Sequence, residues 1–187
     1  MSEHLELEDF TLTDNKRVSG ESLENFFEKS QKLKKFNLRG TELMKQPDRP
    51  IMKKLNKNIN EISFKLCNFF NDKNFLDSET VFENLTVLDL QNCVNVSDEA
   101  FKFLLTLVPN LVELDLRECV GIGVSLQMLP IYCSKLKILE LRNCKFLDGN
   151  FFFLFILSIF FFFYFFLFIY FLFIFYFYLF LFIYFFI

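Results

Sequence analysis

The chain has 187 residues, enough for one ordinary domain. Its formal net charge of −3 argues against a broad positive surface that would bind nucleic acid or an anionic membrane through charge alone. Phenylalanine is in excess, with 31 residues against no tryptophan. Residues 151–187 contain only Phe, Leu, Ile and Tyr apart from Ser158, so residues 1–150 and 151–187 need separate explanations.

The N-terminal sequence MSEHLELEDF is acidic and lacks the apolar segment of a secretory signal peptide. We therefore expect an intracellular, cytoplasmic protein. In that reducing environment the five cysteines are predicted to be thiols rather than a disulfide framework.

A nine-residue pattern recurs through residues 1–150. It is clearest in LTVLDLQNC (85–93), LVELDLREC (111–119) and LKILELRNC (136–144), where places one, four and six are apolar and place nine is cysteine. Steps of 26 residues backward reach similar segments at 59–67, 33–41 and 7–15. Six units therefore begin near residues 7, 33, 59, 85, 111 and 136, the last one truncated, and this period predicts a repeat architecture.

The second part of a unit is predicted to be a helix that follows a short strand and a turn. Residues 18–29 (VSGESLENFFEK) and 96–107 (VSDEAFKFLLTL) align three periods apart. Ser19 and Ser97 are the predicted N-caps, and apolar residues at helical spacing follow both. The second unit should differ, because Pro47 and Pro50 break its helix and predict an irregular turn.

No such unit can bury its apolar face alone, whereas stacked units form one continuous core. The predicted fold is therefore an α/β solenoid, with a curved parallel sheet on the concave side, helices on the convex side and a Phe-rich hydrophobic tail after it.

Cysteine at place nine is predicted to be structural, because a small buried side chain that is a weak hydrogen-bond donor suits the turn after a strand. Asparagine or threonine can serve there too. The residues concerned are Cys67, Cys93, Cys119 and Cys144. They lack the close pairs of zinc sites, so neither a metal nor a cofactor is predicted.

This pattern resembles the cysteine-containing subclass of the leucine-rich repeat superfamily, most closely in LTVLDLQNCVNVSDEAF (85–101). Many members of that subclass are F-box/leucine-rich-repeat proteins. In these the repeats select a substrate and a separate F-box joins an SCF-type ubiquitin ligase. The resemblance implies a substrate-recognition module for a protein partner, including a ubiquitination substrate. The first unit begins at Leu7, which leaves no room before it for an F-box.

Alternation along the strands places the third, fifth and seventh residues of each unit on the concave face. In the last three units an acidic column at place five lies beside a mostly basic one at place seven. The predicted protein-binding residues are Asp89, Gln91, Glu113, Asp115, Arg117, Glu140 and Arg142. The alternative is a solvated face whose charges pair with one another. An enzyme is not expected, since His4 is the only histidine and no glycine-rich phosphate loop is present.

Residues 151–187 allow three interpretations. The uninterrupted apolar run could form a transmembrane anchor, although it exceeds one span, and the chain would then be a membrane-anchored repeat scaffold. It could be non-native translated sequence, because every residue type in it can be encoded by T-rich codons that lack G. A buried core segment is the third interpretation, which the lack of a polar face disfavours.

Overall fold

The computed structural model describes residues 6–44, 50–76, 78–145, 170–172 and 174. The chain forms two compact regions, Met1–Asp148 and Gly149–Ile187. In the C-terminal region, residues 170–172 and 174 are helical, and Tyr170, Phe171 and Leu172 are exposed. The remainder of the predicted hydrophobic tail, and with it the choice among its three interpretations, lies outside the described residues.

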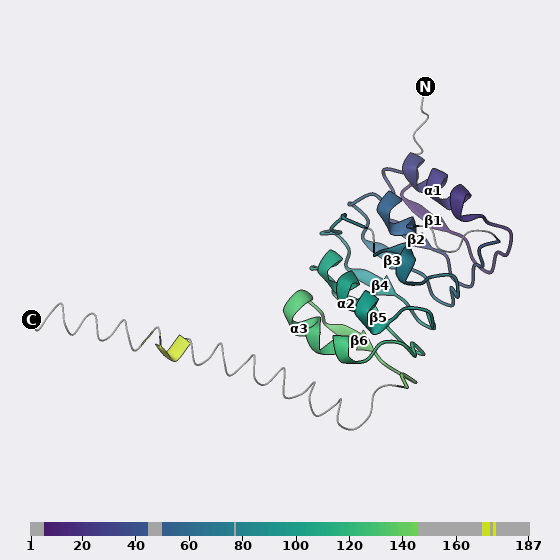
Figure 1. Cartoon of the computed structure of the whole chain (residues 1–187). Helices are drawn as coiled ribbons and strands as arrows, with labels where there is room; N and C mark the ends of the chain where they lie inside the picture. Colours follow the sequence, from purple (N-terminus) through teal and green to yellow (C-terminus); the bar gives the residue numbers. More distant parts are fainter. Residues whose placement is uncertain (1–5, 45–49, 77, 146–169, 173, 175–187) are drawn as a thin grey trace, which may run out of the picture. The chain divides into compact units, whose positions relative to one another are not determined.

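The N-terminal region contains a six-stranded sheet in which the strands follow one another in chain order (Figure 1). The strands are β1 (Asp9–Thr11), β2 (Lys35–Asn37), β3 (Glu61–Ser63), β4 (Val87–Asp89), β5 (Glu113–Asp115) and β6 (Ile138–Glu140). All neighbours pair in parallel, and paired residues are 26 positions apart except between β5 and β6, where they are 25 apart. The predicted α/β architecture with a parallel sheet is confirmed.

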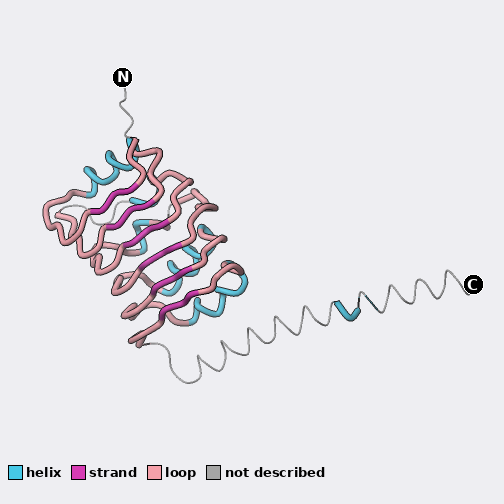
Figure 2. The backbone as a smooth tube through the Cα atoms, turned by 180° about the vertical axis from the view of Figure 1, so that it is seen from behind, coloured by secondary structure: helices cyan, strands magenta, loops and turns pink. Residues whose placement is uncertain are grey.

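The helices lie on one side of this sheet and leave the other side open (Figures 1 and 2). The α-helices are α1 (Gly20–Lys29), α2 (Asp98–Leu107) and α3 (Leu129–Tyr132), and the 3₁₀ helices are η1 (Ile51–Lys54), η2 (Asp72–Asn74) and η3 (Val124–Met128). Both predicted N-caps are confirmed. The Ser19 hydroxyl accepts from the Ser22 amide at 3.1 Å, and the Ser97 hydroxyl accepts from the Ala100 amide at 3.2 Å.

Helices in three of the units differ from the expected α-helix. In the second unit, residues 45–49 lie outside the described residues and a 3₁₀ turn follows Pro50, where an irregular turn was expected. In the third unit, Asn71 is the N-cap of the three-residue helix η2, and its side chain accepts from the Lys73 amide at 2.9 Å. In the fifth unit, η3 begins after Gly123 and leads into α3, which has Pro130 in its first turn.

The core changes in character along the sheet. In the first three units phenylalanine rings form a continuous chain of contacts from Phe10 to Phe75. At its centre Phe64 lies 5.2 Å from Phe36 and 4.0 Å from Phe70, measured between ring centroids. In the fourth and fifth units fully buried leucines take over at places one, four and six: Leu85, Leu88, Leu90, Leu111, Leu114 and Leu116. Both compositions produce a fully buried interior.

The first and last units are less completely covered than the units between them. Leu7 is 38% exposed and Phe10 is half-buried. At the other end Leu136, Leu139 and Leu141 are half-buried, although the equivalent leucines of the fifth unit are fully buried. Each end unit has a neighbour on one side only within the described sheet, and its apolar places are covered accordingly.

The turn after every strand has one feature that the sequence did not suggest to us. Place eight has a positive φ, between 51° and 66°, in all six units: Asp14, Gly40, Leu66, Asn92, Glu118 and Asn143. This left-handed conformation suits glycine and asparagine and disfavours longer side chains. The backbone therefore repeats more strictly than the side chains at this place.

Candidate protein-binding surface

The open face of the sheet contains a groove of about 480 Å³ that crosses β1 to β5. Its polar and charged lining residues come from places three, five and seven: Asp9, Thr11, Lys35, Asn37, Glu61, Ser63, Asp89, Glu113, Asp115 and Arg117. The strands place these side chains on one face because residues two apart in a strand point the same way. The helices are on the other face (Figure 1).

Place five has a local role in four consecutive units. The side chain at that place accepts a hydrogen bond from the backbone amide at place seven. The pairs are Asn37 with Arg39 at 2.9 Å, Ser63 with Lys65 at 3.4 Å, Asp89 with Gln91 at 3.0 Å, and Asp115 with Arg117 at 3.0 Å. These bonds fix the turn after the strand. The run of Asn, Ser, Asp and Asp at one place is the sequence signal that could have predicted this role.

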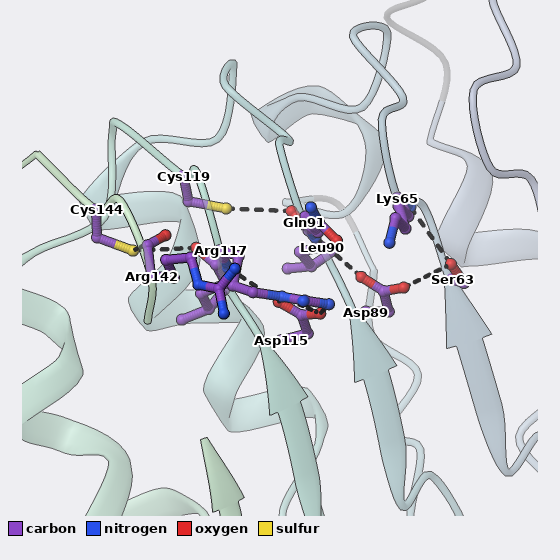
Figure 3. A network of polar contacts seen from close by, with 11 residues as sticks. Ser63, Lys65, Asp89, Leu90, Gln91, Asp115, Arg117, Cys119, Arg142 and Cys144 are labelled. Atoms are coloured by element: carbon purple, nitrogen blue, oxygen red, sulfur yellow. Dashed lines mark hydrogen bonds and ion pairs between the residues drawn. The ribbon is translucent and has the colours of Figure 1, made fainter. Parts of the chain in front are cut away.

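Asp115 and Arg117 form the most closely bonded ionic pair on this face (Figure 3). The Arg117 Nε donates to both carboxylate oxygens of Asp115, at 3.0 and 2.9 Å, and Nη2 also contacts Oδ2. Asp115 lines the groove of the open face, as predicted, and is only 8% exposed. The Arg117 side chain pairs with its carboxylate.

The burial of Asp115 disfavours its charged form and acts to raise its pKa. Hydrogen bonds from the Arg117 side chain and backbone, together with the charge of Arg117, act in the opposite direction and prevail, so the pKa of Asp115 is lowered. The hydrogen bond to Asp115 raises the pKa of Arg117 in turn. The pair is therefore charged at neutral pH.

The other predicted binding residues are less constrained. Asp89 accepts from the Ser63 hydroxyl at 3.2 Å and from the Gln91 amide. Gln91 Oε1 is buried, and no hydrogen-bond partner for it lies among the described residues. Glu113 is half-buried, and Glu140 and Arg142 are exposed. Within the described part of the chain, no hydrogen bond or ion pair is made by the side chains of these last three residues.

The predicted structural cysteines form a ladder of hydrogen bonds between neighbouring units, and Figure 3 shows Cys119 and Cys144 beyond the ends of the strands. Each thiol donates to the carbonyl at place six of the preceding unit: Cys67 to Leu38 at 2.9 Å, Cys93 to Phe64, Cys119 to Leu90 and Cys144 to Leu116, the last three at 3.1 Å. The Thr41 hydroxyl makes the same bond to Leu12 at 2.9 Å. Place nine therefore supplies a compact donor that joins neighbouring units.

Burial disfavours the thiolate form of these cysteines. Burial raises the pKa of Cys67 and of Cys119 to about 12, and it raises the pKa of Cys93 as well. Cys133, outside the ladder, is also buried, and its pKa rises to about 11. Thiolates are the metal-binding form of cysteine. Within residues 6–145, as far as the structure describes them, no group of three or more His, Cys, Asp or Glu residues is arranged to hold a metal ion.

None of the described helices combines the length and apolar character needed to cross a membrane. In comparisons with known proteins, no family model and no curated protein matched this sequence.

Proposed function

We propose that residues 7–150 form a leucine-rich-repeat solenoid of the cysteine-containing type, and that its open sheet face binds a protein. The observation that carries this proposal is the groove across β1 to β5, lined by ordered columns of charged side chains on a sheet whose strands pair one full unit apart. Stacked repeats of this kind present extended binding surfaces.

The partial exposure of the first and last units supports the solenoid part of the proposal. Each unit buries its apolar places against its two neighbours, as one-dimensional stacking requires, and the end units have only one neighbour within the described sheet. The thiol ladder supports it too, since four successive bonds join equivalent places of adjacent units.

The resemblance to F-box/leucine-rich-repeat proteins narrows the proposal. In proteins of that family the repeats select a substrate for an SCF-type ubiquitin ligase. By this resemblance, the partner of the open face would be an intracellular protein that is ubiquitinated. The chain itself would bind and would not catalyse. The predicted contact residues are those of β4 to β6 and the turns that follow these strands.

Site-specific crosslinking in the cells that produce the chain tests the proposal. A photo-crosslinking amino acid replaces Ile138, which is 45% exposed on β6, or Ile131, which is 49% exposed on α3. The two positions have the same native side chain and nearly the same exposure, and they differ in the face that presents them. We expect a defined protein adduct from position 138 and none from position 131. Equal adducts from both positions would contradict binding by the open face.

The second candidate is a membrane-anchored repeat scaffold that uses the same open face near a bilayer. It is favoured by the apolar composition of residues 151–187, among which Tyr170 and Phe171 are exposed helical residues. Membrane association that resists alkaline extraction would support the anchor. Recovery of the full chain in the high-speed supernatant would exclude it.

A further inference from the structure

We propose that the open face of β4 to β6 binds a partner segment in which arginine or lysine stands beside aliphatic residues. This inference depends on the proposed function, and it names the chemistry of the partner. Three features of the face support it: an excess of carboxylates, carboxylates without an internal cation, and exposed apolar side chains between them.

The groove contains five carboxylates and two cations. The carboxylates belong to Asp9, Glu61, Asp89, Glu113 and Asp115, and the cations are Lys35 and Arg117. Both cations are already engaged, since Lys35 forms an ion pair with Glu61 and Arg117 forms one with Asp115. The groove therefore has a net negative charge that its own residues do not neutralise.

Toward β6 the carboxylates without a bonded cation are Asp89, Glu113 and Glu140. Glu113 and Glu140 have no side-chain hydrogen bond or ion pair with described residues, and the hydrogen-bond donors to Asp89 are neutral. The charge of Arg117 acts on Asp89 and Glu140 through space, but Arg117 is bonded to Asp115. Neighbouring parallel strands are about 4.8 Å apart, so Asp89, Asp115 and Glu140 form a column of carboxylates. Guanidinium and ammonium groups make the strongest hydrogen bonds to such carboxylates.

Apolar side chains flank this charge at place three. Val87 pairs with Glu113, and Glu113 pairs with Ile138 across the sheet. Val87 is half-buried and Ile138 is 45% exposed. An aliphatic side chain on either side of a basic residue would cover Val87 and Ile138 while the basic group meets Glu113. Residues two apart in an extended segment share a face, so a segment with aliphatic residues two positions before and two positions after a basic residue fits this order, whereas a polyanion such as a nucleic acid is repelled.

Three labelled ten-residue peptides test the inference by fluorescence anisotropy on the full chain in a non-ionic detergent. The first repeats the sequence Leu-Ser-Arg-Ser, which places leucine and arginine on one face of an extended chain, the second has glutamate in place of arginine, and the third has serine in place of leucine. We expect the first to bind, the second to show no binding and the third to bind at least fivefold more weakly. A rise in NaCl from 50 to 500 mM should weaken binding of the first peptide.

Matched variants locate the interaction. The double variant Glu113→Lys with Glu140→Lys should lower the affinity for the first peptide at least tenfold. The control Glu83→Lys with Glu99→Lys makes the same charge change at exposed residues that do not line the groove, and should change affinity less than twofold. Circular dichroism verifies that both variants are folded.

The results separate this inference from the proposed function. Equal weakening by both double variants, or equal binding of the glutamate peptide, would overturn the inference. If crosslinking at position 138 identifies a partner whose contacting segment lacks basic residues, the inference is also overturned and the proposed function stands. If position 131 crosslinks as well as position 138, the proposed function itself fails.

Discussion

The first three units and the last three units share one backbone pattern, but they differ in how their charged side chains pair. In the first half, opposite charges meet across neighbouring units. Five such ion pairs join residues 26 positions apart: Lys16 with Glu42, Lys32 with Glu6, Lys34 with Glu8, Lys35 with Glu61 and Lys54 with Glu28. In the described part of the second half, the one ion pair joins Asp115 and Arg117 within a single unit, and Asp89, Asp115 and Glu140 follow one another with the same sign.

The difference shows how the in-register pairing of parallel strands sets the neighbour of each charged residue. Each place meets the same place of the next unit, so alternating signs attract and equal signs repel. The first half pairs opposite charges across its units, and the second half carries a column of carboxylates in which Asp115 is bonded to Arg117 while Asp89 and Glu140 have no bonded cation among the described residues. A binding partner would gain most from the second half, because there its charges would replace repulsion rather than displace existing pairs.

The two halves also differ in their cores, and the largest expected effect tests that difference. Phe64 and Leu90 both occupy place six and are fully buried. Phe64→Ala should lower the free energy of unfolding by about 3–5 kcal/mol, because it removes the ring that contacts Phe36 and Phe70. Leu90→Ala should cost about 2–5 kcal/mol, with the smaller cavity. Urea denaturation of the full chain measures both, and a loss below 1 kcal/mol for Phe64→Ala would contradict the aromatic chain as a core.

Alkaline pH should act to the same degree on one matched thiol of the ladder in each half. Burial raises the pKa of Cys67, in the first half, and of Cys119, in the second, from 9.0 to about 12. Above pH 9 the unfolded chain loses these protons while the folded chain keeps them, so stability falls as pH rises from 9 to 12. The slope is about 1.4 kcal/mol per pH unit for each thiol.

Threonine is the matched replacement, because Thr41 makes the same bond at place nine. Cys67→Thr and Cys119→Thr should each reduce the alkaline loss of stability by the share of one thiol. Urea midpoints at pH 8, 9 and 10 measure it. A midpoint that falls as steeply in both variants as in the native chain would show that these thiols do not titrate as proposed.

A smaller effect is expected at place eight, where one unfavourable residue lies in each half. Leu66 and Glu118 have φ of 60° and 63°, which suits asparagine better. Glu118→Asn should raise the free energy of unfolding by about 1 kcal/mol. Leu66→Asn should raise the free energy of unfolding by less, because Leu66 is half-buried and its replacement removes apolar contacts. Thermal denaturation gives the comparison, and a destabilised Glu118→Asn variant would show that Glu118 makes an unrecognised contact.

The smallest effect should have opposite signs in the two halves. Lys35→Glu and Glu113→Lys both reverse a charge at place three. The first breaks the pair with Glu61 and should lower the urea midpoint, and the second puts a positive charge beside the column of Asp89, Asp115 and Glu140 and should raise it. Addition of 1 M NaCl should bring both midpoints closer to the native value. Shifts of the same sign would remove the distinction between the halves.

The parallel sheet and the two N-caps could be predicted because their signals recur in the side chains. Apolar residues at places one, four and six and serine before each helix are chemical requirements of the structure. The left-handed turn is a backbone requirement, and Leu66 and Glu118 obscure the Asp, Gly and Asn found in the other units.

Two further features depend on contacts that a repeat pattern does not encode. The helix of the third unit is only the three-residue 3₁₀ helix η2, capped by Asn71, and the period alone does not reveal this. The burial of Asp115 follows from the conformation of Arg117, which pairs with a carboxylate of its own unit. The charge columns could be predicted from the sequence, whereas the pairing of individual side chains within them could not.

The step between β5 and β6 is one residue shorter than the others, yet Glu113 still pairs with Ile138 and the Cys144 thiol still reaches the Leu116 carbonyl at 3.1 Å. The missing residue is therefore absorbed between the strands, on the helical side. The helical side should therefore tolerate insertions. A reporter epitope or an affinity tag inserted after α3 should leave the pairing of the six strands unchanged.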